Sequence, residues 1–293
     1  MAKVKITGHA SGSGVITVTA PNTSTDRTIT LPDGDVTLGA ATPSITDNGN
    51  ANAITIDSAE NVGIGVTPEA WHNDYRNLAV GGTGALWSQK AVGTGKAMGV
   101  GQNVYYDGSN KYITTDEASR YYQANGVHTF EVAASGSADA AISWIDAMSI
   151  SNAGIVTKPK QPAFAARYSS SQTGNWNGEW FIPNNTAGFG CNVGSHYNSS
   201  NGRFYAPVAG TYFFSMSVRM DSRTGDYWYL DLMLNGTMRH RQLTDEINTY
   251  DNLFVAGVIP MAYNDYVQAR ITTAGDTSSN VSEESSFTGF LIG

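Results

Sequence analysis

Two tryptophans stand close together in a polar, turn-rich stretch, TGNWNGEWFIPNN, at residues 173–185. Trp176 and Trp180 supply aromatic surfaces there, while Asn177 and Glu179 supply an amide and a carboxylate. A sugar has one apolar face and a ring of hydroxyl groups, so an aromatic platform flanked by polar groups is suited to bind it. These four residues are therefore a candidate receptor contact. The alternative is that both indoles pack over the fold or between subunits.

A second candidate for chemistry is the stretch DSRTGDYWYLD, which contains Asp221, Asp226 and Asp231. Three carboxylates close in sequence could hold calcium, but their spacing lacks the alternating pattern of a calcium-binding loop. The five histidines also lack the spacing of metal ligands. We therefore expect no cofactor and no metal site, with calcium kept as the alternative.

Catalytic patterns are missing from the sequence. Glycosidases need two carboxylates across a cleft, whereas adjacent carboxylates on a strand point to opposite faces. The sequence has no nucleophile elbow and no phosphate-binding loop. The adjacent acidic pairs are Asp116-Glu117, Asp245-Glu246 and Glu283-Glu284. We expect solvated turn residues at these pairs, no catalytic residue and no enzymatic activity.

The composition excludes several classes of partner. Charged residues make up only 14% of the 293 residues, glycine is abundant at 32, and the formal net charge is −8. Nucleic-acid binding needs a basic face, and no run of lysine or arginine could form one. No apolar run is long enough to span a membrane, so we expect no membrane insertion. The single cysteine, Cys191, excludes an intrachain disulfide.

Such a chain must position its residues on many short strands joined by turns. In RTITL, Ile29 and Leu31 share one face, which is the period-two pattern of a half-buried strand, and Asp33-Gly34 forms the following turn. So small a segment, residues 1–40, cannot bury a core alone. We expect it to dock onto a larger assembly.

Residues 41–160 are predicted to form a β-rich shaft or spacer. Tyr105-Tyr106 leads into a DGSN turn, which predicts a hairpin, and VHTFEV at 127–132 alternates as a strand does. TTDEASRYYQ at 114–123 is the one segment that could form a helical turn, with Thr115 as its cap. This region holds too few long aliphatic side chains for a core of its own, so we expect three chains to wrap together.

The strands lengthen from residue 161 to residue 293. GTYFFSMSVRM at 210–220 alternates throughout, with Tyr212 and Phe214 on the face that it predicts to be buried. YWYLDLMLNGT at 227–237 places Trp228 and three leucines together and then turns at Asn235-Gly236, a strong hairpin signal. These strands favour a two-sheet sandwich or jelly roll.

Aromatic, proline and glycine residues in this region follow a definite order. The pattern comprises Phe204, Pro207, Gly210, Tyr212 and Phe214, followed by Leu234-Asn235-Gly236 and by Phe287, Gly289 and Phe290 near the end. It resembles the globular head of the complement q subcomponent, in the tumour-necrosis-factor-like superfamily. The resemblance implies a ten-stranded jelly roll that forms tight trimers and packs aromatic side chains along a three-fold axis.

The first half of the chain resembles a different class of protein from the head. Animal members of that family carry a collagen stalk, and this chain has no Gly-X-Y repeat. TDRTITLPDGDVTLG (25–39) and ENVGIGVTP (60–68) instead resemble segments of bacteriophage fibre proteins.

Taken together, the three regions predict an all-β, elongated, homotrimeric fibre with a β-rich shaft and a C-terminal jelly-roll head. The expected role is a phage virion fibre, on a tail or as a spike, whose N-terminus binds other virion proteins and whose head binds a host surface glycan or protein. The alternatives are a capsid head fibre or decoration protein, a polysaccharide depolymerase, and a free bacterial lectin.

Overall fold

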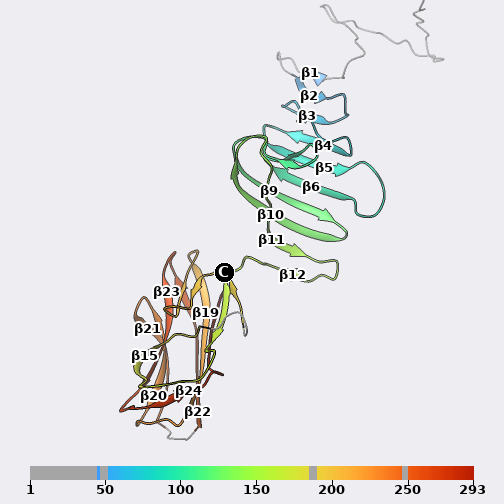
Figure 1. Cartoon of the computed structure of the whole chain (residues 1–293). Coiled ribbons are helices and arrows are strands. Elements are labelled where there is room, and N and C mark those ends of the chain that lie inside the picture. The colour runs from blue at the N-terminus through green and yellow to red at the C-terminus, as the bar shows by residue number, and fades with distance from the viewer. Residues whose placement is uncertain (1–44, 47–51, 185–189, 246–249) are drawn as a thin grey trace, which may run out of the picture. The chain divides into compact units, whose positions relative to one another are not determined.

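The computed structural model describes residues 45–46, 52–184, 190–245 and 250–293 (Figure 1). All regular secondary structure in these ranges is β-strand, which confirms the predicted all-β class. Over the same ranges, no helix is long and apolar enough to cross a membrane. The predicted docking strands around Ile29 and Leu31 lie outside the described residues.

A ten-stranded sheet precedes the C-terminal head, and its strands lie side by side in chain order (Figure 1). Neighbouring strands are antiparallel, except that β3 and β4 run parallel. The strands are β1 (Ile45–Thr46), β2 (Asn52–Ile56), β3 (Val62–Ile64), β4 (Tyr75–Val80), β5 (Gly84–Gln89), β6 (Ala97–Gln102), β9 (Asp116–Ala124), β10 (Val127–Gly136), β11 (Ile145–Ile150) and β12 (Val156–Thr157). The predicted hairpin is confirmed as β7 (Tyr105–Tyr106) paired with β8 (Asn110–Lys111).

The predicted helical turn at 114–123 is wrong, because most of that segment is strand β9. β9 pairs with β6 on one side and with β10 on the other. Thr115 does not cap a helix, since its hydroxyl accepts a hydrogen bond from the backbone N–H of Ala138. Pairing on both edges overrides a weak local preference, as tertiary context commonly does.

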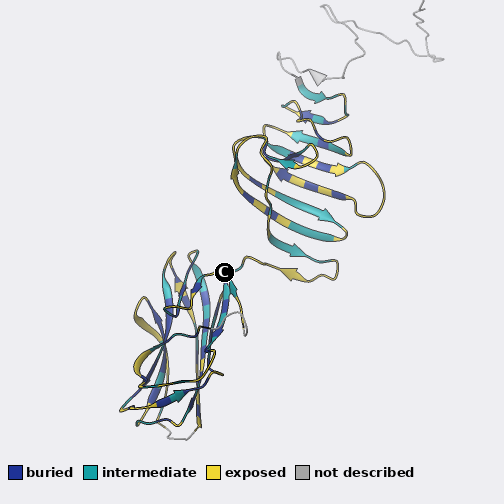
Figure 2. Ribbon diagram, viewed as in Figure 1, coloured by how far each residue is buried: buried dark blue, intermediate teal, exposed yellow. Residues whose placement is uncertain are grey.

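The two faces of the ten-stranded sheet differ in burial, and Figure 2 shows the alternation along β5 and β6. One face, here called the covered face, carries buried Trp87 and half-buried Tyr122 beneath the loops that cross it. The other, here called the open face, carries a row of directly paired apolar side chains. This row consists of Leu86, Val100, Tyr121, Phe130 and Met148.

The head is built from two sheets that enclose one large apolar core. The first head sheet has seven strands: β13 (Ala163–Arg167), β14 (Gln172–Gly174), β16 (Asn192–Val193), β19 (Gly210–Asp221), β22 (Tyr250–Met261), β24 (Ser279–Val281) and β25 (Ser286–Leu291). The second head sheet has six: β15 (Asn177–Phe181), β17 (Tyr197–Asn198), β18 (Arg203–Tyr205), β20 (Trp228–Leu234), β21 (Thr237–Thr244) and β23 (Tyr266–Thr273). The count exceeds the expected ten because several strands are only two or three residues long.

The alternation predicted for 210–220 is confirmed along β19. Its inward side chains are all fully buried: Tyr212, Phe214, Met216, Val218 and Met220. The hydroxyl of Tyr212 donates a hydrogen bond to the carbonyl of Val208, 2.8 Å away, which ties the strand to the turn before it. Phe204 and Phe287 join the same core, whereas Phe290 points outward and is exposed.

The predicted turn at Asn235-Gly236 is confirmed between β20 and β21. Both residues have positive φ, 50° and 80°, as a tight hairpin turn requires. Asn235 also binds the neighbouring turn, because its side-chain amide donates to the carboxylate of Asp265 at 2.7 Å. This hydrogen bond lowers the pKa of Asp265, and a second one from the backbone N–H of Ala262 acts in the same direction.

Candidate functional site

Trp176, the first of the two predicted contact tryptophans, is buried in the core of the head. Its indole N–H donates to the carbonyl of Ser279 at 3.2 Å, and its backbone N–H donates to the carboxylate of Asp276 at 2.7 Å. Trp176 therefore packs in the core of the head, which was the alternative to sugar contact. Its indole is enclosed and offers no platform for a sugar.

The residues after Trp176 form a strand and not a loop. Residues 177–181 form strand β15, which pairs with β23 and contains a bulge at Gly178, where φ is +87°. The segment looked like a loop because its polar residues and glycine are typical of turns. Asn177 and Glu179 are exposed and Trp180 is half-buried, so three of the four predicted residues remain accessible.

Trp180 begins a row of paired residues across the second head sheet. Along this row, here called the arginine row, Trp180 lies opposite Arg270, Arg270 opposite Asp231, and Asp231 opposite Arg241. The guanidinium carbon of Arg270 lies 5.9 Å from the ring centroid of Trp180. The arginine row thus places an aromatic ring beside Arg270, with Arg241 two strands further along the same face.

Asp231 holds this row together from a fully buried position. Its carboxylate accepts hydrogen bonds from Nε of Arg241 at 2.6 Å and from Nη2 of Arg270 at 2.7 Å. The hydrogen bond to Asp231 raises the pKa of Arg241, whose guanidinium carbon also lies 3.9 Å from the ring centroid of Tyr229. One carboxylate and two guanidinium groups give the arginine row itself one net positive charge.

The three aspartates considered for calcium do not come together. Asp231 is engaged by Arg241 and Arg270, and Asp221 accepts a hydrogen bond from Nε of Arg219 at 2.9 Å. Among the described residues, no group of three or more acidic, histidine or cysteine side chains could hold a metal ion.

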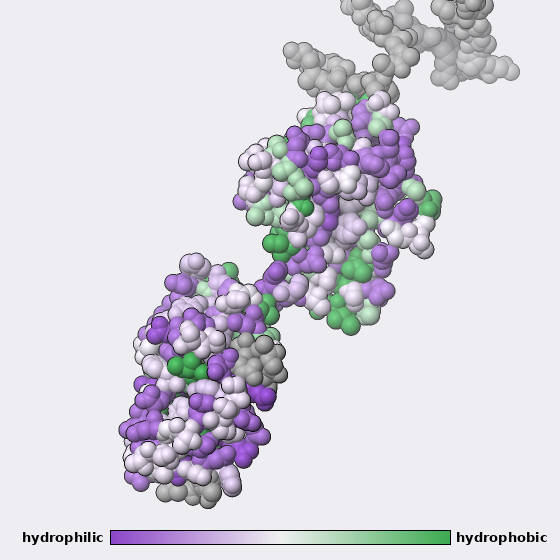
Figure 3. Space-filling model, viewed as in Figure 1, coloured by the Kyte–Doolittle hydropathy of each residue, from purple (hydrophilic) through white to green (hydrophobic). Residues whose placement is uncertain are grey.

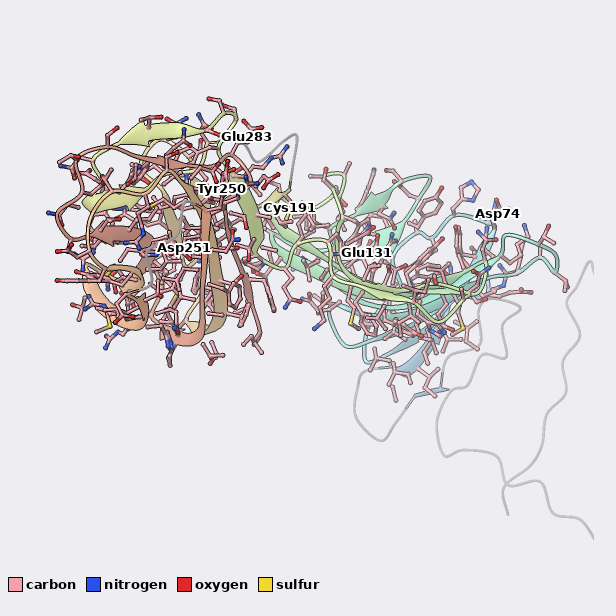
Figure 4. All side chains as sticks on the ribbon, turned by 90° about the horizontal axis from the view of Figure 1, so that it is seen from below. Asp74, Glu131, Cys191, Tyr250, Asp251 and Glu283 are labelled. Atoms are coloured by element: carbon pink, nitrogen blue, oxygen red, sulfur yellow. The ribbon has the colours of Figure 1, made fainter. Side chains whose placement is uncertain are left out.

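The predicted acidic pairs have separate surroundings. Glu284 binds Arg219 at 2.6 Å on the surface of the head, while Asp116 and Glu117 lie exposed at the start of β9. Glu246, of the pair 245–246, lies outside the described residues. Asp251, labelled in Figure 4, belongs to none of these pairs. Its carboxylate accepts a hydrogen bond from the indole N–H of Trp228 at 2.8 Å.

The first head sheet has an outer face of a different character. Strands β22, β19 and β25 place Val258, Phe213 and Phe290 directly side by side, and the rings of Phe213 and Phe290 lie 5.4 Å apart. Phe254, further along β22, is 58% exposed and Val258 is 49% exposed. We call Phe213, Phe254, Val258 and Phe290 the apolar outer face. It suits contact with another apolar surface, whereas the arginine row suits a polar ligand.

Sequence reasoning missed the arginine row. Its residues are far apart along the chain and meet only through strand pairing. One signal was available, because Asp231 interrupts the apolar run WYLDLML. A carboxylate inside a buried strand needs a positively charged partner.

Residues 163–292 match the family model of the C1q domain. The C-terminal region is therefore a C1q domain, a jelly roll of the tumour-necrosis-factor-like kind, as the order of aromatic residues predicted. One similar solved structure is the globular domain of zebrafish complement 1qA protein. It is 18% identical, with 45% of this chain and 98% of that chain covered and a TM-score of 0.34. C1q domains are generally non-enzymatic binding or structural modules, and they typically form trimers. The match begins at residue 163, and the boundaries expected at 40 and 160 stay predictions.

Proposed function

We propose that this protein is a homotrimeric phage virion fibre, on a tail or as a spike, that attaches to the host surface through its C1q head. Residues 1–40 bind other virion proteins, residues 41–160 act as the spacer, and the assembly lies on the exterior of the particle. The protein has no enzymatic activity in this proposal. The resemblance of the first half to bacteriophage fibres supports the virion location.

The observation that carries the proposal is that the head and the ten-stranded sheet of a single chain each leave one apolar face uncovered. On the head this is the apolar outer face, and on the ten-stranded sheet it is the open face, where Val100 is 50% exposed and Leu86 is 42% exposed. Figure 3 shows that hydrophobic residues also reach the surface in several patches of the part that carries this sheet. Contiguous apolar surface of this kind marks an interface. Three copies would cover both faces.

Host contact is assigned to the second head sheet. Asn177, Glu179 and Trp180 lie on β15, beside Arg270 of the arginine row. An aromatic ring with neighbouring amide, carboxylate and guanidinium groups can stack on a sugar and bond its hydroxyls. Three heads present this surface three times, so weak single contacts combine through effective concentration. Trp176 is left out because it is buried.

Two other functions remain as alternatives. A capsid head fibre or decoration protein would use the same trimer at another place on the particle. A depolymerase would need two carboxylates facing each other across a sugar-sized cleft. Asp116 and Glu117 are exposed neighbours on one strand, so their carboxylates do not face each other across a cleft.

Two measurements test the proposal. Light scattering should give the mass of three chains for the purified protein, and gold-labelled antibodies should bind phage particles under the electron microscope. Label at the tail tip supports the fibre, and label over the capsid supports the first alternative. A folded monomer at micromolar concentration, or particles without label, would contradict the proposal.

A further inference from the structure

A cavity of about 140 Å³ lies on the covered face of the ten-stranded sheet. Aromatic rings form most of its wall. Trp87 and Tyr122 lie on β5 and β9, Tyr75 begins β4, Tyr106 ends β7, and Trp71 lies in the loop before β4. A cavity of about 150 Å³ is large enough for one benzene molecule, so this one has room for a single six-membered ring.

The five rings form one continuous surface. The ring of Trp87 lies 5.7 Å from that of Tyr122, 5.6 Å from that of Tyr75 and 6.1 Å from that of Trp71, and the ring of Tyr106 lies 4.9 Å from that of Tyr75. The backbone makes space for this arrangement. A Cβ atom on Gly99, which pairs with Trp87, would lie only 2.5 Å from Cζ2 of its indole.

A buried ion pair supplies the polar edge of the cavity. The side chains of Arg120 and Glu131 are each 10% exposed, and Nε of Arg120 donates to the Glu131 carboxylate; Figure 4 labels Glu131 on the sheet. Nη1 of Arg120 donates to Oδ1 of Asn110 at 3.0 Å. The guanidinium group also lies between two rings, 4.7 Å from the centroid of Tyr122 and 4.4 Å from that of Trp144. Arg120 is therefore fixed in place before any ligand arrives.

The indole N–H of Trp87, which lines the cavity, is buried without a hydrogen-bonding partner among the described residues. The polar side chains of Asn110 and Arg120 and the tyrosines Tyr75, Tyr106 and Tyr122 also line the cavity. Burial raises the pKa of Tyr75, and the neighbouring Tyr106 and Tyr122 raise it further. The cavity thus combines flat aromatic walls with both donors and acceptors.

We propose that this aromatic cavity binds one pyranose ring of a neutral glycan. The apolar face of the sugar stacks on the ring of Trp87, and the ring of Tyr75 meets the edge of the sugar. The hydroxyls of the sugar bond to Asn110, to Arg120 and to the tyrosine hydroxyls. The proposal does not rest on the function assigned to the head, and it gives the ten-stranded sheet a ligand of its own.

Other ligand classes fit less well. A hydrocarbon would leave the amide and the tyrosine hydroxyls unpaired when it excluded water. A quaternary ammonium ion suits aromatic cages, but Arg120 already occupies the face of the Tyr122 ring. An anion would gain little, because Glu131 neutralises Arg120.

The test uses the full chain and ligand-observed NMR with the methyl glycosides of glucose, galactose, mannose and N-acetylglucosamine. We expect saturable binding of at least one glycoside with a millimolar dissociation constant. Tyr106→Phe keeps the ring and removes one hydroxyl, and Asn110→Ala removes the amide. Each should weaken binding about fivefold or more, since each removes hydrogen bonds to the ligand. Tyr227→Phe, at an exposed position of the head, is the matched control and should bind normally.

Melting temperatures identify any variant that fails to fold, and Tyr106→Phe is the milder change if Asn110→Ala disturbs Arg120. Three results would overturn the inference: no binding of any of the four glycosides, binding that both variants leave unchanged, or binding of choline in place of the sugars. A wild-type chain that binds a glycoside but does not adsorb to host cells would count against the function proposed for the head and not against this inference.

Discussion

Phe214 and Gly289 lie directly opposite each other on strands β19 and β25, and a Cβ atom on Gly289 would lie 2.4 Å from Cδ1 of the phenylalanine ring. The ring is fully buried, so it has no free space into which to move. Gly289, part of the sequence pattern of the head, therefore leaves the space that the ring of Phe214 occupies.

The first prediction is that Gly289→Ala destabilises the head by about 1 to 3 kcal/mol, the usual cost of overpacking a core. Urea unfolding followed by tryptophan fluorescence measures the loss. Gly174→Ala is the control, because Gly174 is also in the first head sheet and a Cβ there would meet nothing within 4 Å. Equal midpoints for the two variants would contradict this account of Gly289.

The second prediction concerns the carboxylate at the centre of the arginine row. Asp231→Asn should destabilise the head by about 2 to 3 kcal/mol, because it weakens charged hydrogen bonds to Arg241 and Arg270 at a fully buried position. Glu284→Gln removes a surface partner of Arg219 and should cost about 1 kcal/mol or less. The explanation fails if thermal unfolding shows the two variants to be equally stable.

The third prediction is a pH dependence from Asp265. Its pKa is lowered in the folded head, mainly by the hydrogen bond from Asn235, so its stabilising effect is complete above the unfolded value of about 3.9. The effect is then lost as the pH falls through the lower, folded value. Asp265→Asn should therefore lose less stability than the wild type when the pH is lowered from neutral to about 3. Parallel urea titrations at the two pH values measure this, and equal losses would rule out the assignment.

The fourth prediction tests the apolar outer face. Phe254→Glu and Val258→Glu should give folded monomers, because both side chains are exposed in a single chain and a buried charge would oppose association. Met238→Glu is the control, since Met238 is 43% exposed on the second head sheet. Sedimentation velocity distinguishes the species. Intact trimers of both face variants would move the subunit contact elsewhere.

The fifth prediction separates the two tryptophans. Trp176→Ala should lower the stability of the head by about 3 to 5 kcal/mol, the usual cost of truncating a buried tryptophan. Trp180→Ala should cost much less and should instead reduce adsorption to host cells. Calorimetry and an adsorption assay on the same preparations give both quantities. Normal adsorption of the Trp180 variant would remove β15 as the host contact.

The sequence was most informative where the determining pattern is local. The alternation around Tyr212 and the Asn235-Gly236 turn depend on residues that are close along the chain, and both predictions were confirmed. The burial of Trp176 depends on Asp276 and Ser279, which lie about a hundred residues later, so its polar neighbours gave a misleading indication.

The same reason explains the errors at the sites. Residues 116–124 form a strand because β6 and β10 pair with them, and the arginine row and the aromatic cavity are each assembled from several strands. Tyr122 on β9 contacts Trp87 on β5 across the intervening strand β6, and it lines a cavity that no spacing in the sequence could indicate.

The order in which strands pair along the chain differs between the ten-stranded sheet and the head, and this difference has a consequence for biosynthesis. Each strand of the ten-stranded sheet pairs with its predecessor or with a strand nearby in the chain, so the sheet can grow as the polypeptide leaves the ribosome. The head cannot, because Ala163 on its first strand, β13, pairs with Phe290 on its last strand, β25. Its core stays open until β25 has left the ribosome. A chain released before β25 is made would therefore have a finished sheet and an aggregation-prone head.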